Sequence, residues 1–172
     1  MTEGTSLSPE TVAAQRGPFA GSDGHFDAPY LPTPMPLVER MLDLAGVEAG
    51  TRLVDLGCGD GRIVLAAARR GASATGIDID GERIAEGEAA AAASGLTSLA
   101  RFSRGDMFAL DLSGFDVVTL YLLGHVNGWL EGKMLRELQP GARVVSHAFP
   151  MPNWVPAAQE TWEGRQLNLW VL

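Results

Sequence analysis

The sequence of 172 residues contains a single cysteine, Cys58. One cysteine cannot form an intrachain disulfide, and it cannot supply the set of thiolates that a structural metal site needs. The sequence also has no run of about 18 apolar residues that would span a membrane. Its first residues form neither a basic region nor an apolar stretch of the kind found in export signals. We therefore expect a cytoplasmic protein with no metal site and no membrane partner.

Positive charge is scarce as well. Lys and Arg together number 13 against 21 Asp and Glu, which gives a formal net charge of -8. Such a surface would repel the phosphate backbone of a nucleic acid, so we do not expect a nucleic-acid partner. Hydrophobic residues nevertheless make up 46% of the chain. Together with the length, this content predicts one domain with a single continuous core.

The beginning of the chain differs in composition from the rest. Residues 1-28 are rich in Gly, Ser and Pro and poor in large apolar side chains, a composition that does not offset the entropy of ordering. We predict that these residues form a flexible N-terminal arm and that residues 29-172 form the domain. The closely spaced prolines of Pro29-Tyr30-Leu31-Pro32-Thr33-Pro34 favour an extended path at the junction.

Beyond residue 34, short apolar runs alternate with helical patterns. We expect strands at residues 53-56, 72-79, 100-103, 116-122, 142-147 and 167-172, and helices at residues 36-44, 62-70, 81-94 and 126-138. This alternation predicts an α/β fold with a mainly parallel sheet covered by helices on both faces. No sizeable insertion separates the core strands, so we expect an open site without a cap domain.

A glycine-rich loop follows the first expected strand, in Asp55-Leu56-Gly57-Cys58-Gly59-Asp60-Gly61. Glycines at alternate positions allow a ligand to lie close to the backbone where a strand turns into a helix. A dinucleotide-binding loop would have its third glycine at position 62, which is Arg62, and a phosphate-binding P-loop would end in Gly-Lys-Ser/Thr. The spacing therefore argues against both NAD and a nucleotide phosphate.

Two acidic residues follow the next two strands. Asp78 ends the second strand about 20 residues after the glycines, where a carboxylate can accept hydrogen bonds from ribose hydroxyls. Asp106 follows the third strand, where it can accept from an adenine amino group. Each residue also has a purely structural interpretation, Asp78 at a helix N-terminus and Asp106 as the cap of the turn before Phe108. Their joint order with the glycine loop favours one nucleoside-containing cofactor.

These motifs resemble those of class I S-adenosylmethionine-dependent methyltransferases, and the likeness covers nearly all of residues 30-172. The more specific stretches are Pro29-Tyr30-Leu31-Pro32-Thr33-Pro34, Asp55-Leu56-Gly57-Cys58-Gly59-Asp60-Gly61-Arg62-Ile63-Val64, Val117-Val118-Thr119-Leu120-Tyr121-Leu122-Leu123, Val126-Asn127 and Arg143-Val144-Val145-Ser146-His147. They are similar to small prokaryotic protein lysine methyltransferases and to their mitochondrial relatives of the FAM173 type. The resemblance implies a Rossmann-like fold with a twisted, mainly parallel sheet, helices on both faces and an antiparallel C-terminal strand.

The same resemblance implies that the cofactor is S-adenosyl-L-methionine. Asp55 and the loop glycines would lie near its methionine portion, Asp78 near the ribose, and Asp106 with Met107 near the adenine. The implied cofactor-binding residues are Tyr30, Thr33, Asp55, Gly57, Cys58, Gly59, Gly61, Asp78, Ile79, Asp106 and Met107.

The resemblance also implies that Tyr30 and Thr33 close over the cofactor. The chain departs from the group after its Ser-His pair, where an acidic residue is frequent and this sequence has Ala148. If that carboxylate helps to hold a target lysine, the departure affects recognition of the acceptor.

Methyl transfer is an in-line displacement, so the protein chiefly has to align the reacting atoms and exclude water. A lysine amine, whose ordinary pKa is about 10.4, must also lose its proton, which an apolar channel promotes. Aromatic residues suit such a channel, and the candidates are Tyr30, Tyr121 and Trp154. We favour Tyr121 as a catalytic residue because it follows the fourth strand, and His147 could orient a substrate or accept a proton through water. The alternative for both is a place in the core. The remaining tryptophans are expected in the core: Trp129, Trp162 and Trp170.

Three functions remain open from the sequence. The first is methyl transfer to a protein lysine, and the second is methyl transfer to the nitrogen, oxygen or carbon of a small molecule. The third is a non-catalytic subunit that binds S-adenosylmethionine for a partner. The oligomeric state is not indicated.

Overall fold

The computed structural model describes residues 30–172. The predicted flexible arm, residues 1-28, lies outside the described residues and stays a prediction, as does the division into an arm and one domain. None of the helices in the described range is long and apolar enough to cross a membrane.

The described residues form one seven-stranded sheet with the strand order β3-β2-β1-β4-β5-β7-β6. The strands are β1 (Arg52–Leu56), β2 (Ser73–Asp78), β3 (Ala100–Arg104), β4 (Val117–Leu120), β5 (Arg143–His147), β6 (Ala158–Trp162) and β7 (Arg165–Val171). The first five strands are parallel, whereas β7 runs antiparallel to both β5 and β6. The Rossmann-like fold with its antiparallel C-terminal strand is thus confirmed.

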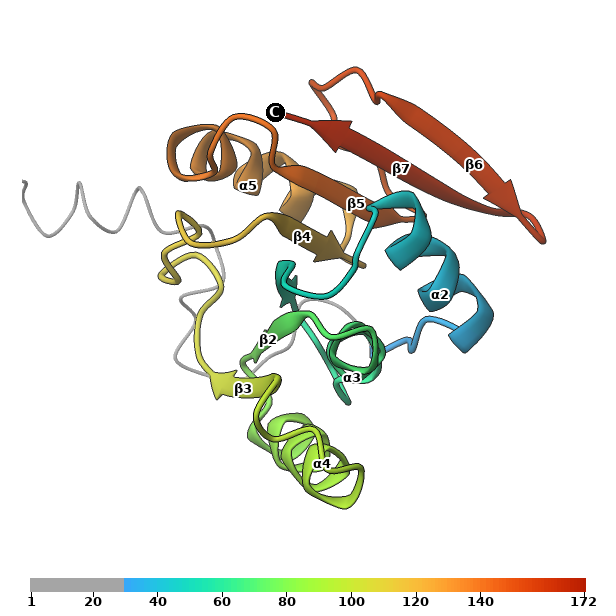
Figure 1. The fold of residues 1–172 in the computed structure, drawn as a ribbon. Helices are drawn as coiled ribbons and strands as arrows, with labels where there is room; N and C mark the ends of the chain where they lie inside the picture. The colour runs from blue at the N-terminus through green and yellow to red at the C-terminus, as the bar shows by residue number, and fades with distance from the viewer. Residues whose placement is uncertain (1–29) are drawn as a thin grey trace, which may run out of the picture.

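Helices cover both faces of this sheet, as predicted. They are α2 (Met35–Leu44), α3 (Arg62–Arg69), α4 (Gly81–Ala93) and α5 (Gly124–Glu137). Figure 1 shows α5 on the opposite face of the sheet from α2 and α3. Each face has its own apolar cluster: Leu53 of β1 packs with α2 and α3, while the next residue, Val54, packs with α5. The central strands are therefore buried on both sides, which explains why they read as apolar runs.

Local signals account for both ends of α4. Asp80 precedes α4, and its side chain accepts a hydrogen bond from the backbone N–H of Glu82, which is the usual N-cap arrangement. Gly95, expected to end this helix, lies just beyond it with φ of 66°. Only glycine adopts such a conformation without steric cost, so the expected stop is confirmed.

The C-terminal hairpin is the main feature that the sequence did not reveal. Strands β6 and β7 are joined by the two residues Glu163 and Gly164, both with positive φ. Side chains of β6 alternate between half-buried and exposed, so this edge strand lacks an apolar run. Because Glu163-Gly164 is not one of the common hairpin pairs, the turn also gave no signal. The expectation that Trp129 lies in the core is wrong, since it is 40% exposed on α5.

Candidate cofactor and acceptor site

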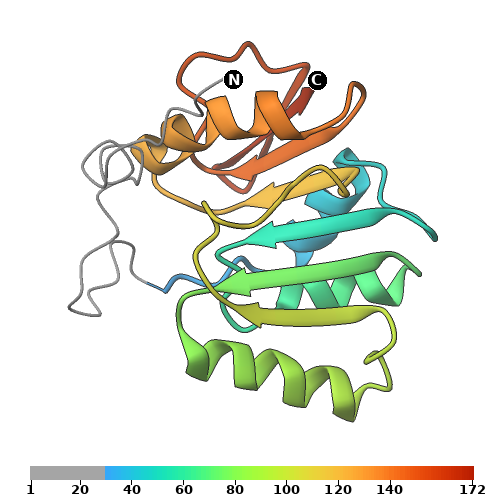
Figure 2. The same ribbon diagram turned by 90° about the vertical axis from the view of Figure 1, so that its left-hand side faces the viewer.

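The parallel strands end at one edge of the sheet, on the left in Figure 2. The strand order reverses between β1 and β4, and ligands of open α/β sheets bind outside the carboxyl ends of the strands at such a point. This edge gathers most of the predicted site residues, since Asp55 lies on β1, Asp78 ends β2, Asp106 follows β3 and His147 ends β5. The fold therefore brings together residues that are far apart in the sequence.

The glycine loop has the conformation that the spacing predicted. Gly57, Gly59 and Gly61 all have positive φ, at 77°, 53° and 81°. The backbone N–H groups of Gly57 and Cys58 donate to the carbonyl of Ile77 at 2.9 and 3.0 Å, which ties the loop to β2. A Cβ on Gly61 would collide with the ring of Phe102. Glycine is thus required here both by the backbone and by packing.

Asp78 links the end of β2 to the glycine loop. One of its carboxylate oxygens accepts from the backbone N–H of Gly59 at 2.8 Å, and the other accepts from the N–H of Asp80 at 2.9 Å. Each carboxylate oxygen has a further lone pair, so the side chain retains acceptor capacity for ribose hydroxyls. Since Asp80 and not Asp78 caps α4, the structural alternative does not account for Asp78. Its role toward ribose stays a prediction.

Asp55 is buried beneath the loop and accepts a hydrogen bond from the hydroxyl of Thr119 at 2.8 Å. Burial raises the pKa of this carboxyl to about 7; the Thr119 bond acts against the rise, and the negative charges of Asp78 and Asp60 add to it. Near neutral pH the group is therefore present in both its charged and its neutral form. A cationic ligand such as S-adenosylmethionine, with its sulfonium and ammonium groups, suits a site with this excess of negative charge.

The predicted adenine side of the site is more open. Asp106 is exposed, and its carboxylate accepts from the backbone N–H of Phe108 at 2.9 Å, which is the turn-capping arrangement weighed as the alternative. Met107 is half-buried, and Ile79 is 52% exposed at the same edge. The N–H of Gly105 donates to the Asp78 carbonyl, so a backbone hydrogen bond joins the segments that follow β2 and β3. The roles of Asp106, Met107 and Ile79 toward adenine stay predictions.

Residues 30–34, which we name the strap, lie against the glycine loop. A Cβ on Gly59 would be only 2.7 Å from Cε2 of Tyr30, so the tyrosine ring rests on that glycine. The guanidinium of Arg83 lies 4.1 Å from the centre of the same ring. Burial and a hydrogen bond to Asp60 raise the pKa of Tyr30, so its hydroxyl is protonated at neutral pH. The side chain that was expected to cover the cofactor is thus placed over the loop.

Further along the strap, Thr33 is buried and its hydroxyl lies 3.1 Å from Nδ1 of His147. His147 in turn stacks on Tyr121, with ring centroids 3.9 Å apart. Burial, with the positive charge of Arg165, lowers the pKa of His147 to about 4. Such an imidazole is neutral at physiological pH and a weak base, which favours an orienting role over proton abstraction. Its burial also agrees with the alternative of a core histidine.

The loop after β5 is held by polar residues of α5 to which the sequence analysis gave no role. Nδ2 of Asn127 donates to the Phe149 carbonyl at 2.9 Å, and Glu131 accepts from the backbone and side-chain amides of Asn153 at 2.9 and 2.8 Å. Asn127 and Glu131 are four residues apart and both buried, so they lie on one face of α5. The sequence did contain a signal for this role, because two polar residues four positions apart interrupt an otherwise apolar face of the helix.

The remaining acceptor-side candidates are placed differently from one another. Ala148 directly follows His147 and has φ of 65°, a conformation in which Asn, Asp and Gly are favoured. Trp154 packs edge-on against Trp170, and the indole N–H of Trp170 donates to the Trp154 carbonyl. These contacts place Trp154 beside β7, and none of them joins it to the Tyr121–His147 pair.

Comparison with known proteins agrees with this geometry. A model of the ANTKMT methyltransferase domain matches residues 55–158. The chain belongs to this methyltransferase family. It is 45% identical over 130 residues to a protein-lysine N-methyltransferase of Saccharolobus islandicus, covering 74% of this chain and 81% of that protein. It is also 37% identical over 131 residues to the adenine nucleotide translocase lysine N-methyltransferase of Mus musculus, covering 76% of this chain and 57% of that protein.

The chain therefore spans little more than half the length of this mouse relative. Among solved structures, it resembles an RNA methyltransferase from Salinibacter ruber in complex with S-adenosyl-L-homocysteine, with a TM-score of 0.81 and 44% identity. That likeness covers 82% of this chain and 93% of the other. The enzyme is therefore an S-adenosylmethionine-dependent methyltransferase, as the motifs predicted.

Proposed function

We propose that this methyltransferase transfers a methyl group to the side-chain amine of a lysine in a protein substrate. The observation that carries the proposal is the stacked pair of Tyr121 and His147 at the carboxyl ends of two adjacent strands. The names of the curated relatives, which refer to lysine N-methylation, support the same acceptor. We further propose that the reaction takes place in the cytoplasm.

The chemistry fits an acceptor that must be uncharged when it attacks. When S-adenosylmethionine is bound, it supplies a methyl group already activated by the sulfonium, so the residues of the protein need only orient the amine and exclude water. Neither Tyr121 nor neutral His147 carries a negative charge that would replace water in stabilising an ammonium ion. Desolvation against this aromatic wall lowers the pKa of a lysine amine and favours its reactive neutral form.

We assign the cofactor side to residues of the glycine loop, the strap and the strand ends. Asp55 and the loop would face the methionine portion, Asp78 the ribose, and Asp106 the adenine. The full set is Tyr30, Thr33, Asp55, Gly57, Cys58, Gly59, Gly61, Asp78, Ile79, Asp106 and Met107. On the acceptor side we assign Tyr121 as the wall residue, with His147 and Tyr30 beside it.

RNA is the second candidate acceptor, because the similar Salinibacter ruber protein is described as an RNA methyltransferase. Binding of RNA depends largely on positive charge near the phosphates. This chain has a formal net charge of -8, which favours a protein acceptor over RNA. A small-molecule acceptor and a non-catalytic role are the further alternatives.

The test incubates the purified protein with methyl-labelled S-adenosylmethionine and a cell lysate that is then separated into protein, RNA and small-molecule fractions. Peptide mass spectrometry locates any methyl group in the protein fraction. We expect label on lysine, its loss with the Asp78→Ala variant, and its retention with Asp111→Ala, which removes an exposed aspartate from the loop after β3. Label confined to RNA or to small molecules would overturn the lysine proposal, and label in no fraction would point to a non-catalytic role.

A further inference from the structure

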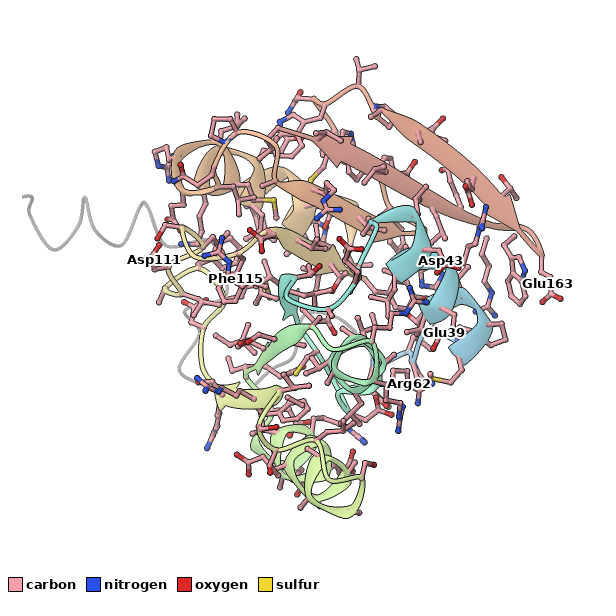
Figure 3. The ribbon with its side chains drawn as sticks, in the orientation of Figure 1. Glu39, Asp43, Arg62, Asp111, Phe115 and Glu163 are labelled. Carbon is pink, nitrogen blue, oxygen red and sulfur yellow. The ribbon has the colours of Figure 1, made fainter. Side chains whose placement is uncertain are left out.

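Arg62 stands at an electrostatically unfavourable place, the first residue of α3. The N-terminus of a helix carries partial positive charge, so a cation there is repelled unless other partners offset the effect. The side chain turns to such partners: it lies beside α3 next to the strap in Figure 3 and is only 29% exposed. The contacts of the side chain must therefore offset the unfavourable position.

Those contacts join the glycine loop to the strap. The guanidinium of Arg62 forms a bidentate pair with Asp60 of the loop, with Nη2 at 2.6 Å and Nε at 3.1 Å from the two carboxylate oxygens. Its Nη1 donates to the backbone carbonyl of Thr33 in the strap at 3.0 Å. Although burial acts in the opposite direction, hydrogen bonds from Arg62 and Tyr30 lower the pKa of Asp60 and keep it ionised. One ion pair thus holds both ends of the strap, Tyr30 through Asp60 and Thr33 directly.

The two ends of the strap contact different halves of the site. Tyr30 rests on Gly59, on the cofactor side. Thr33 contacts the ring of His147, which stacks on Tyr121 on the acceptor side. A change in how the strap is seated would therefore affect both sides at once.

We propose that Arg62 is a positioning residue that seats the strap, so that Tyr30 covers the glycine loop while Thr33 fixes the ring of His147 beside Tyr121. Arg62 itself contacts neither reacting group. It acts through two contacts, one with the carbonyl of Thr33 and one with the carboxylate of Asp60. The acceptor side and the cofactor side are therefore both held in place by the same arginine. The inference concerns the geometry of the methyltransferase site and does not depend on the acceptor being lysine.

The test compares Arg62→Gln with Arg69→Gln, which removes the same charge from an exposed position at the other end of α3. Two measurements avoid the need for an identified acceptor. Calorimetry gives the dissociation constant of S-adenosylmethionine, and NMR follows the titration of the His147 ring. His147 faces Thr33, Tyr121 and the charge of Arg165, and all three are unchanged in both variants.

We expect Arg62→Gln to weaken cofactor binding about tenfold, the effect of losing hydrogen bonds from a charged group. We also expect the midpoint of the His147 titration to rise from about 4 toward its ordinary value of about 6.5, because the ring becomes hydrated when Thr33 is released. Arg69→Gln should change the dissociation constant by less than about twofold, as is usual for surface substitutions. An unchanged His147 titration in a folded Arg62→Gln protein would overturn the proposal.

Two further variants guard against a purely structural effect. Arg62→Lys keeps the charge but cannot form the bidentate pair and reach the Thr33 carbonyl together, so it should restore only part of the loss. Thr33→Gly removes the side chain that covers the ring of His147, so water reaches the ring and the titration midpoint should rise on its own. The last variant combines Arg62→Gln with the substitution of Thr33. If Arg62 acts through Thr33, this double variant shifts the midpoint of the His147 titration no further than the larger single change does. Fully additive shifts would contradict the mechanism.

Discussion

The imidazole of His147 lies flat on the phenol ring of Tyr121, with centroids 3.9 Å and planes 29° apart. The pairing of β4 with β5 explains this contact. Leu120 is opposite Ser146, so Tyr121, which directly follows β4, lies level with His147, the last residue of β5. Two residues 26 positions apart in the chain (147 minus 121) thus form one aromatic surface. The pair lies beside the switch point of the sheet, where we propose that Tyr121 forms the wall for the acceptor.

Removing the hydroxyl of Tyr121 tests whether this residue acts on the acceptor side or on the cofactor side. Tyr121→Phe keeps the stacked ring, so we expect an unchanged melting temperature and an unchanged dissociation constant for S-adenosylmethionine. If the hydroxyl also orients the acceptor by a hydrogen bond, kcat should fall about tenfold, which corresponds to roughly 1.4 kcal/mol of lost transition-state stabilisation. Steady-state kinetics with calorimetry on the same preparations make the comparison. Equal losses in turnover and in cofactor affinity would assign the hydroxyl to the cofactor side instead.

Asp78 is expected to carry a large share of cofactor affinity. Asp78→Ala removes the predicted bonds to ribose and also releases the N–H of Gly59 in the loop. We expect binding of S-adenosylmethionine to weaken by about 1 to 3 kcal/mol, as for lost hydrogen bonds to a charged group. The matched control is Asp80→Ala, which removes the cap of α4 and should lower stability by about 1 kcal/mol with little effect on affinity. Full cofactor affinity in Asp78→Ala, measured by calorimetry, would refute the ribose assignment.

The buried carboxyl of Asp55 predicts a particular dependence of stability on pH. Because its pKa is raised to about 7 in the folded state, the folded protein holds a proton that the unfolded chain, with a pKa near 3.9, releases earlier. This contribution to stability is fully present below pH 4 and is lost as the pH rises through about 7. Asp55→Asn removes the titration, so its unfolding free energy relative to the parent should increase by about 2 to 3 kcal/mol between pH 5 and pH 8.

Urea denaturation of both proteins at each pH measures this difference. His147 contributes in the opposite sense, since its lowered pKa makes stability fall as the pH drops from about 6.5 to 4. That contribution is common to both proteins and cancels in the comparison. A difference that does not vary with pH would show that Asp55 keeps an ordinary pKa in the folded state.

Ala148 is held in a left-handed conformation that costs an alanine about 1 kcal/mol. Asparagine tolerates this conformation and does not carry the unfolded-state entropy of glycine, so Ala148→Asn should raise the unfolding free energy by about 0.5 to 1 kcal/mol. Glu163→Asn, at the other non-glycine residue with positive φ among residues 30–172, should give a similar gain. Ala157→Asn, at an exposed alanine without positive φ, should give none. Thermal unfolding of the three variants tests the explanation, which a destabilised Ala148→Asn would refute.

The sequence predicted the parts of the fold whose signals are local. Strand β1 was recognisable because Leu53 and Val54 are buried against opposite faces of the sheet. The glycine loop was recognisable because its backbone requires positive φ at alternate residues. Strand β6 escaped because an edge strand with one side in solvent carries only a weak apolar pattern.

The same limit applies to the site. The positions of Asp55 and Asp78 follow from strand order, so their motifs could be interpreted without a structure. The contact between Thr33 and His147 joins residues 114 positions apart, and no local pattern reports such a pairing. In the sequence, Arg62 showed only that the loop lacks the third glycine of a dinucleotide-binding motif. Its bond to the strap could not be predicted, because it depends on how the strap packs against the loop.

The contact between the strap and His147 also has a consequence for the order of folding. The strap precedes β1, whereas its partner ends β5, so a large part of the chain must be in place before this bond closes. Contacts of such long sequence separation are slow to form, because chain closure costs entropy before the contact stabilises anything. A refolding molecule would regain its helical signal while the contact between the strap and His147 is still open. Recovered methyl transfer would therefore report the last stage of folding.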